Sequence, residues 1–304
     1  YHVLLKRLHY IDTYIVMLIR LYKTLQPQLC KVWTHSVRAL QTSRSRAGVS
    51  SDTVTVDGHK IHYVKAGSGP YTCLCMPGAL GTGEGDFVHQ LSGLAGDEVT
   101  LLAWDPPGYG KSRPPKRRFD KDYLRRDAAL AAQTMKELGY SRYGVLGWSD
   151  GGVAGIILAA NNKQAVDKLV VWGVNAYVTQ EDAARCQGLR DVSTWSARMR
   201  TPLEEMYGVD GFRSICEQWV DGYSALYNEK DGDLCKKECG EVQCPTLVVH
   251  GMKDPIIPIT HAHYFEQHMP AAKVRYMEEG KHNLHMKYAD EFNKMVLQFL
   301  TQQQ

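Results

Sequence analysis

The sequence predicts an α/β fold: a mostly parallel, eight-stranded sheet with helices on both faces and a helical insertion. Three observations support this. Short apolar runs of strand length recur along the chain, and longer stretches with helical periodicity alternate with the later ones. This alternation is typical of parallel sheets covered on both faces. The segment 174–242 has no strand-like run, and we expect it to form the insertion.

Eight runs have the length and apolar character of strands: Thr53–Val56, Lys60–Ala66, Tyr71–Met76, Thr100–Trp104, Tyr143–Leu146, Lys168–Trp172, Thr246–His250 and Lys273–Met277. We expect the first two to form an antiparallel hairpin, because Asp57-Gly58 between them is a favoured two-residue turn. Helices are predicted over Tyr123–Leu138 and Tyr288–Leu300, where apolar residues recur at helical spacing. The core therefore has two parts, 49–173 and 243–304, and about 250 residues suffice for one buried core.

A serine lies between a predicted strand and a predicted helix in Gly147-Trp148-Ser149-Asp150-Gly151-Gly152. The strand is Tyr143–Leu146, and the Ala-rich apolar run Val153–Ala160 predicts a buried helix. The glycines let neighbouring backbone approach a sharp bend while the serine hydroxyl projects into a cleft. This arrangement is typical of the nucleophile elbow of α/β-hydrolases, whose following helix presents its N-terminus to the developing oxyanion. We therefore predict the α/β-hydrolase fold with Ser149 as nucleophile; the alternative is a chance Gly/Ser turn.

Two later residues supply an acid and a base in the order that this fold requires. Asp254 follows the strand-like run 245–251, and His282 follows the run 274–277. Ligands bind beyond the carboxyl ends of strands in open α/β sheets, so the three side chains should meet there. His282 would take the proton of Ser149, and Asp254 would fix the tautomer of the imidazole. Taken singly, Asp254 could be a turn residue and His282 a surface histidine.

A more specific pattern is carried by five segments: Gly147-Trp148-Ser149-Asp150-Gly151-Gly152, Ala103-Trp104-Asp105-Pro106-Pro107-Gly108-Tyr109-Gly110, Asn175-Ala176-Tyr177-Val178-Thr179, Trp219-Val220-Asp221-Gly222 and Gly280-Lys281-His282-Asn283-Leu284-His285. Together they resemble the biphenyl hydrolase-like, or valacyclovir hydrolase, family, from about Val54 to Leu300. The resemblance implies a serine esterase that cleaves α-amino acid esters, including prodrug-type esters, with aminoacyl thiolactones as further candidates. The chain departs from that family at Pro107, where the family typically has arginine, so a charge near the site entrance is missing.

Asp150 follows the nucleophile, so its backbone N–H is expected to donate to the oxyanion. Its carboxylate has two interpretations. An acid in the first turn of a helix is stabilised by the helix dipole by roughly 0.3–1 kcal/mol, which would be reason enough for its presence. The alternative is that Asp150 binds the α-ammonium group of the substrate, which lies two bonds from the reacting carbonyl carbon. The resemblance implies this second role.

The second oxyanion donor is expected in the loop 77–81, which follows the predicted strand Tyr71–Met76. By position, either Ala79 or Leu80 supplies the backbone N–H, and the resemblance favours Leu80. Losing one such donor typically costs on the order of 10²–10³ in rate.

Among the charged residues of the predicted insertion lie large aromatic ones that include Trp195, Tyr207, Trp219, Tyr223 and Tyr227. A helical cap over the strand ends would exclude water and shape the acyl pocket. These aromatic side chains could form the core of the cap, or they could line the pocket and favour apolar amino acid side chains.

Residues 1–48 form a predicted transit or leader segment. They contain eight Lys or Arg and a single acid, Asp12, and they end in the basic, hydroxyl-rich run Thr42-Ser43-Arg44-Ser45-Arg46. This composition is typical of mitochondrial transit peptides. The apolar run Tyr14–Ile19 is too short to span a bilayer. We expect mitochondrial localisation, with the cytosol and secretion as alternatives.

The net charge of +3 comes from residues 1–48, so the rest of the chain is slightly acidic, which argues against nucleic acid as a partner. The eight cysteines lack the paired spacing of zinc sites and are expected to be reduced. We predict a monomeric hydrolase of small molecules, without cofactor, metal or stable membrane insertion. Two alternatives remain: a carbon–carbon bond hydrolase of the meta-cleavage type, whose anionic substrates Asp150 would repel, and a non-catalytic binding protein on a hydrolase scaffold.

Overall fold

The computed structural model describes residues 48–229 and 232–302. The predicted leader, 1–48, lies outside the described residues except for Gly48. Its mitochondrial targeting therefore stays a prediction.

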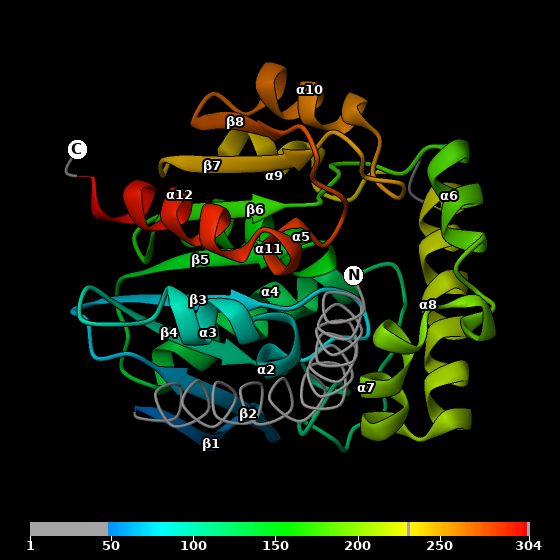
Figure 1. The fold of residues 1–304 in the computed structure, drawn as a ribbon, viewed down its shortest axis with the longest axis horizontal. Helices are drawn as coiled ribbons and strands as arrows, with labels where there is room; N and C mark the ends of the chain where they lie inside the picture. The colour runs from blue at the N-terminus through cyan, green and yellow to red at the C-terminus, as the bar shows by residue number, and fades with distance from the viewer. Residues whose placement is uncertain (1–47, 230–231, 303–304) are drawn as a thin grey trace, which may run out of the picture. The chain divides into compact units, whose positions relative to one another are not determined.

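An eight-stranded sheet forms the centre of the described chain (Figure 1). Its strands in chain order are β1 (Val49–Val56), β2 (His59–Ala66), β3 (Tyr71–Met76), β4 (Val99–Trp104), β5 (Tyr143–Trp148), β6 (Val166–Trp172), β7 (Thr246–Gly251) and β8 (Ala272–Met277). In space they follow the order β1-β2-β4-β3-β5-β6-β7-β8. β2 is antiparallel to β1 and β4, and all other neighbours are parallel. The predicted fold class is therefore confirmed.

Local chemistry explains the first hairpin and the buried centre of the sheet. Asp57 has φ +48° and Gly58 has φ +77°, both left-handed, as a type I′ turn requires. Val56 and His59 then pair across the two-residue loop. Every residue of β4 and β7 is buried, as expected for strands with helices on both faces.

Helices cover the two faces of the sheet, each over its own apolar core (Figure 1). One face carries α3 (Val88–Gly93), α11 (Leu284–Lys287) and α12 (Ala289–Thr301), with α2 (Gly83–Asp86) beside β2 and β4. The other face carries α4 (Tyr123–Glu137), α5 (Asp150–Asn161), α9 (Lys236–Glu241) and α10 (Ile259–His268). The helices predicted at 123–138 and 288–300 are confirmed as α4 and α12.

The helical cap stands at the right of Figure 1, on the side toward which the parallel strands point. It consists of α6 (Gln180–Gln187), the short 3₁₀ helix η1 (Val192–Thr194), α7 (Ala197–Tyr207) and α8 (Val209–Glu229). α8 packs against both α6 and α7, whereas α9 packs against α5 and α10 of the core. α9 lies within the predicted insertion, 174–242, although it packs on the core and not in the cap.

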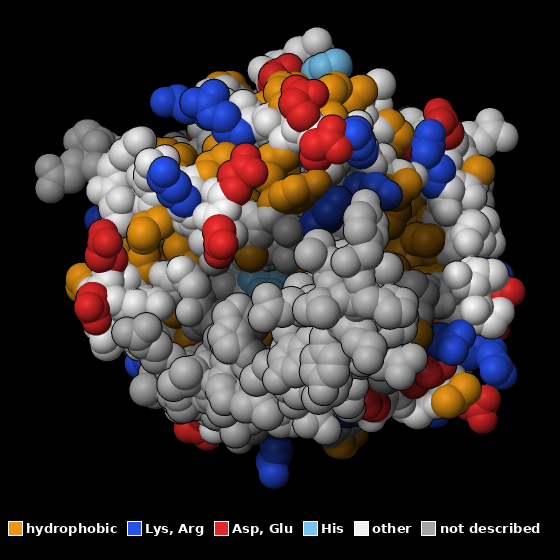
Figure 2. Space-filling model, in the orientation of Figure 1, with side chains coloured by type: hydrophobic (Ala, Val, Ile, Leu, Met, Phe, Trp, Pro, Cys, Tyr) orange, Lys and Arg blue, Asp and Glu red, His pale blue; other side chains and the backbone are white. Residues whose placement is uncertain are grey.

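The surface mixes charges of both signs. On the face drawn in Figure 2, outside the grey atoms, Lys and Arg side chains lie interspersed with Asp and Glu. Among the helices of the described residues, none combines the length and the apolar character needed to cross a membrane.

Candidate active site

Ser149 lies at a strained bend between β5 and α5. Its φ is +54° and its ψ −125°, a combination that residues with a side chain rarely adopt and that clusters at functional sites. The backbone N–H of Ser149 donates to the Trp172 carbonyl at 3.0 Å. A Cβ on Gly151 would come within 2.2 Å of the Met76 carbonyl oxygen, and one on Gly147 within 2.6 Å of Cα of Gly152. Only glycine fits at these two positions, so the bend has the local geometry that the sequence predicts.

His282 and Asp254 form a hydrogen-bonded pair on the loops after β8 and β7. Nδ1 of His282 lies 2.9 Å from Oδ2 of Asp254. The other oxygen of Asp254 accepts the backbone N–H groups of Ile256 at 2.8 Å and Ile257 at 3.0 Å. Burial raises the pKa of Asp254, but the His282 charge and these hydrogen bonds outweigh it and hold the pKa below its ordinary value. An ionised carboxylate at Nδ1 leaves Nε2 of His282 free to act as a base.

Trp148 joins this pair to the elbow. Its indole N–H donates to the carbonyl of His282 at 2.9 Å, and the two rings lie 5.4 Å apart between centroids. A Cβ on Gly173 would come within 2.9 Å of Cε1 of His282, so the imidazole lies directly against the backbone after β6. The structure thus brings the base and the acid beside the residue that precedes Ser149.

His285, three residues after His282, is a structural histidine. Its Nδ1 accepts the indole N–H of Trp172 at 2.8 Å, and its Nε2 donates to the Asp86 carbonyl at 3.0 Å. Burial lowers the pKa of His285 to about 3. The ring is therefore neutral at physiological pH, and both of its nitrogens are engaged.

The loop between β3 and α2 lies against the nucleophile. A Cβ on Gly78 would come within 3.4 Å of Cβ of Ser149. Leu80 is buried and has φ +66°. Asp150 is the first residue of α5, so its N–H has no acceptor within the helix. Ala79 and Leu80 both remain candidates for the second donor.

Asp86 lies behind this loop, and its carboxyl accepts the Gly78 N–H at 3.0 Å. Burial raises the pKa of Asp86 to about 8; the Gly78 N–H lowers it and Asp105 raises it. In the unfolded chain the pKa of an Asp carboxyl is about 3.9. Between that pH and about 8 the unfolded state binds fewer protons, so the free energy of unfolding falls as pH rises.

Asp86→Asn removes this titration and keeps an acceptor for Gly78. We expect the stability gained on substitution to be larger at pH 8 than at pH 5. Urea unfolding of both proteins at the two pH values measures the difference. An equal effect at both would contradict a raised pKa.

The carboxylate of Asp150 lies beneath the cap, held by two neutral donors. Its Oδ2 accepts the hydroxyl of Tyr123 (α4) at 2.7 Å and the indole N–H of Trp219 (α8) at 3.1 Å. Burial raises the pKa of Asp150; these hydrogen bonds and the Arg117 charge oppose this, but the pKa stays above its ordinary value. Among the described residues, no cationic group lies within 4.0 Å of the Asp150 carboxylate, and no group of any kind donates a hydrogen bond to its Oδ1.

Asp150, Arg117 and Asp127 are among the residues that line one small cavity. Arg117 forms a two-pronged ion pair with Asp127, Nη1 lying 2.7 Å from Oδ1, and also donates to the Pro107 carbonyl at 3.1 Å. A guanidinium therefore lies close to the chain at Pro107, but Asp127 balances its charge. Neither Tyr123 nor Arg117 lies in a catalytic motif, so the sequence did not predict a role for them in the site. For Trp219 the sequence allowed two places, the core of the cap or the pocket lining. In the structure its indole N–H donates to the Asp150 carboxylate.

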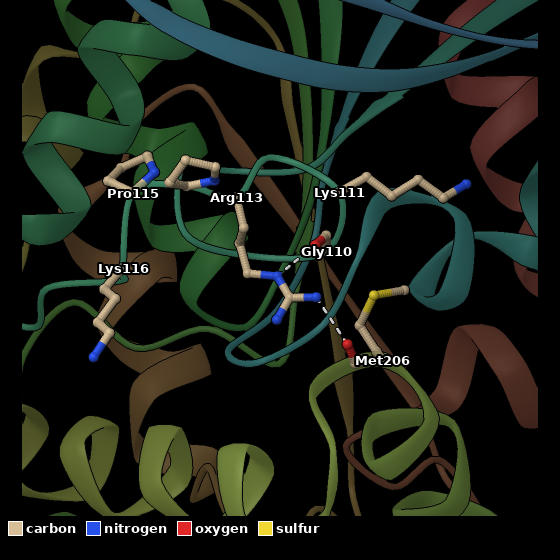
Figure 3. A pocket seen from close by; sticks show the side chains of 7 residues that line it. Gly110, Lys111, Arg113, Pro115, Lys116 and Met206 are labelled. Atoms are coloured by element: carbon tan, nitrogen blue, oxygen red, sulfur yellow. Dashed lines mark hydrogen bonds between the residues drawn. The ribbon is translucent and has the colours of Figure 1, made fainter.

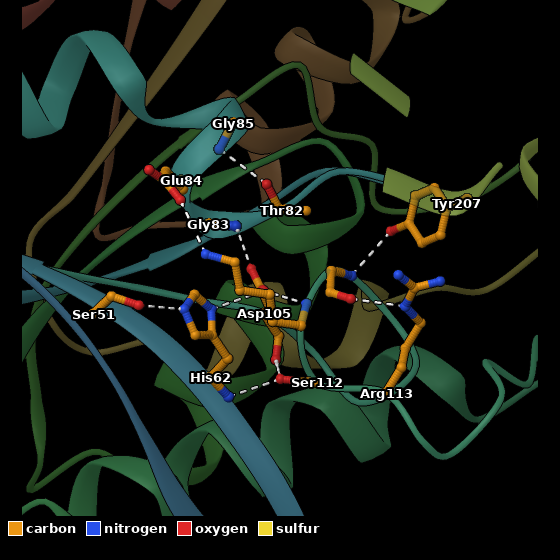
Figure 4. A network of polar contacts seen from close by, with 12 residues as sticks. Ser51, His62, Thr82, Gly83, Glu84, Gly85, Asp105, Ser112, Arg113 and Tyr207 are labelled. Carbon is orange, nitrogen blue, oxygen red and sulfur yellow. Dashed lines mark hydrogen bonds and ion pairs between the residues drawn. The ribbon is translucent and has the colours of Figure 1, made fainter. Parts of the chain in front are cut away.

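A second Ser-His-Asp chain lies across β1 and β2 (Figure 4). The hydroxyl of Ser51 is 2.8 Å from Nε2 of His62, whose Nδ1 is 2.9 Å from Oδ2 of Asp105. Ser51 lies within an exposed strand, not at a bend or a helix N-terminus that could hold an oxyanion. Asp105 also accepts the backbone N–H groups of Gly83 and Lys111. We therefore infer that the series Ser51-His62-Asp105 is structural and holds the loops that follow β3 and β4.

Metal-binding geometry is not found in the described part of the chain, where no three His, Cys, Asp or Glu side chains are grouped to hold an ion. The cysteines described there are free thiols: Cys73, Cys75, Cys186, Cys216, Cys235, Cys239 and Cys244.

Comparison with known proteins shows the family to which the chain belongs. The model of the alpha/beta hydrolase family matches residues 73–295. The serine hydrolase BPHL of Homo sapiens is 46% identical over 266 residues, which cover 88% of this chain and 91% of that protein. Its Mus musculus counterpart is 48% identical over 252 residues, covering 83% of this chain and 87% of that one.

The fold is also similar to that of a meta-cleavage product hydrolase from Pseudomonas fluorescens, CumD. The TM-score is 0.67 with 17% identity, covering 82% of this chain and 96% of that structure. Identity this low supports the fold alone. The two mammalian relatives are far closer in sequence, and the resemblance noted in the five sequence segments is confirmed by them. The chain therefore belongs to the α/β-hydrolase family, among the serine hydrolases related to mammalian BPHL.

Proposed function

We propose that this chain hydrolyses α-amino acid esters through an acyl-enzyme. The observation that carries the proposal is the environment of Asp150. Its carboxylate follows the nucleophile in the chain and lies beneath the cap. Within the described chain it accepts hydrogen bonds from neutral groups alone, and its pKa is raised. A desolvated carboxylate without a cation in contact is unfavourable, and a cationic ligand would relieve that cost.

The proposed reaction uses the groups already described. Ser149 attacks the ester carbonyl while Nε2 of His282 takes its proton, and Asp254 holds the imidazole through Nδ1. The oxyanion is held by the N–H of Asp150 and that of Leu80 or Ala79. His282 then protonates the leaving alcohol and activates a water that releases the acid from Ser149.

The substrate's ammonium group would bind Asp150 through Oδ1, since Tyr123 and Trp219 occupy Oδ2. Without that positive charge, the Asp150 carboxylate would oppose the negative charge that develops on the oxyanion. With it, the two charges form a pair shielded from solvent by the cap. The same group therefore favours amino esters and disfavours acyl groups that are neutral or anionic.

Asp150→Asn is expected to lower kcat/KM for a valine ester by about 100-fold, the typical cost of removing one partner of a buried ion pair. The amide still accepts from Tyr123 and Trp219, so the site should keep its shape. The same variant should not lower kcat/KM for the N-acetylvaline ester and should raise it by less than threefold, a margin of about 0.6 kcal/mol, because the charge that opposes the oxyanion is removed. Steady-state kinetics with both substrates measure this difference.

Asp221→Asn is the matched control, because Asp221 is an exposed carboxylate of α8 paired with Arg190. It removes the same charge from the outer face of the cap and should leave both substrates unaffected. If Asp150→Asn lowered kcat/KM equally for the charged and the neutral ester, the carboxylate would not bind the ammonium group. Its role would be to stabilise the start of α5.

A carbon–carbon bond hydrolase of the meta-cleavage type would share the fold and the Ser-His-Asp trio. The Asp150 carboxylate would repel its anionic substrates. Arg117 would not offset this repulsion, because Asp127 already balances its charge. We therefore place amino ester hydrolysis first.

A further inference from the structure

The turn that carries the candidate oxyanion donors has a strained conformation. The Gly81 N–H donates to the Gly78 carbonyl at 3.2 Å, which closes a four-residue turn with Ala79 and Leu80 at its centre. Leu80 has φ +66°, whereas Ala79 is not among the residues with positive φ. This combination is a type II turn, whose third position normally requires glycine or asparagine.

The conformation of this turn decides where the Leu80 N–H points. Type I and type II turns differ by a flip of the central peptide, here the one that joins Ala79 to Leu80. Leucine by itself favours the type I form, because negative φ avoids the clash of its Cβ. Relaxation to type I would reverse the direction of the Leu80 N–H and leave the Leu80 carbonyl nearly in place. A contact on the Leu80 carbonyl therefore does not select the turn type, but it does hold the turn in place against the core.

A contact of this kind comes from the cap. Tyr207, the last residue of α7, donates its hydroxyl hydrogen to the Leu80 carbonyl at 3.0 Å and accepts the Gly110 N–H at 3.1 Å. Burial raises the pKa of Tyr207 to about 12, although the Gly110 N–H and Arg113 oppose this, so the hydroxyl keeps its proton at physiological pH. A single side chain of the cap therefore joins the turn to the loop after β4.

Arg113 holds Tyr207 in place. Its guanidinium carbon lies 4.7 Å from the centre of the Tyr207 ring, a cation–π contact. It donates to the carbonyl of Gly110 at 2.7 Å and to that of Met206 at 2.8 Å (Figure 3). Figure 4 shows Tyr207 and Arg113 approaching the same backbone segment. The end of α7 is thus fastened to the core next to the turn.

We propose that Tyr207 is a positioning residue that anchors the turn Gly78–Gly81 in its place beside Ser149, so that the seated cap completes the oxyanion hole. The proposal rests on the serine-hydrolase mechanism above, but not on the preference for amino esters. Tyr207 has no hydrogen bond to Asp150 in the described chain. Its contribution should therefore be the same for every ester.

Tyr207→Phe removes the hydroxyl and keeps the ring under Arg113. We expect kcat to fall about tenfold, part of the loss seen when an oxyanion donor is removed outright. KM should stay within twofold, a margin of about 0.4 kcal/mol, because the substrate pocket is unchanged. The fall should be equal for p-nitrophenyl acetate and for a valine ester. A boronic acid, which forms a tetrahedral adduct with Ser149, should bind about tenfold more weakly.

Tyr227→Phe is the control, since Tyr227 is an exposed tyrosine of α8, in the same cap. Titration with a fluorophosphonate counts reactive sites, so kcat is expressed per folded enzyme. An unchanged kcat per site would overturn the proposal, as would a change confined to KM or to the valine ester. If the preference for amino esters proved wrong, the expected effect of Tyr207→Phe on p-nitrophenyl acetate hydrolysis would not change. The experiment therefore tests the role of Tyr207 separately from the proposed substrate class.

Discussion

Replacing Ser149 by alanine is expected to lower kcat for ester hydrolysis by about 10⁶-fold, as loss of the nucleophile does in other serine hydrolases. Ser149 is the side chain that the strained bend places at the start of α5. Alanine must adopt the same backbone conformation, so the variant should fold with nearly unchanged stability. The absence of a burst with an activated ester, and of labelling by a fluorophosphonate, would show that no acyl-enzyme forms.

The matched control is Ser51→Ala. Ser51 is also hydrogen-bonded to a histidine that contacts a buried aspartate. Because it lies on an exposed strand, its loss should change kcat less than twofold, about 0.4 kcal/mol in the barrier. A large loss in Ser51→Ala together with activity in Ser149→Ala would reverse our assignment of the two serines.

Asp254→Asn is expected to lower kcat about 10⁴-fold while leaving the backbone in place. The carboxylate accepts a hydrogen bond from Nδ1–H of His282, which leaves Nε2 without a proton. An amide NH₂ group at the same point would donate to Nδ1 and move the proton to Nε2, where it blocks the base. Pre-steady-state acylation with an activated ester, measured at neutral pH, tests this effect.

Asp182→Asn is the control for loss of a buried acid beside a histidine. Asp182 lies 3.0 Å from Nε2 of His261 and forms the capping box of α6 with Thr179. It should lower thermal stability and leave kcat per active site nearly unchanged. If both variants lost activity in proportion to their loss of folded protein, the role of Asp254 would be structural.

Sequence pattern was sufficient for the fold and for the order of the chemical groups. Asp57-Gly58 predicted a hairpin because few dipeptides accept two left-handed residues in succession, and the turn has that form. The glycines around Ser149 predicted the elbow for the same kind of local reason. Alternation of strands and helices then placed Asp254 and His282 on loops beyond neighbouring strands, where they form a hydrogen-bonded pair.

Sequence pattern could not identify the partners of those groups. Tyr123, Trp219 and Asp150 come from three helices, and nothing in their spacing predicts that two neutral donors share one carboxylate oxygen. Likewise, Tyr207 looked like one of several cap aromatics, yet its hydroxyl reaches the Leu80 carbonyl.

The amino acid sequence thus determined the sheet, the strained serine and the presence of an acid and a base in the right order, because each depends on local backbone preferences or on periodic burial. Only the tertiary structure decided which side chains surround Asp150 and hold the turn at Leu80. Those contacts join residues far apart in the chain, and the packing of the cap on the core selects them from many that the sequence alone would allow.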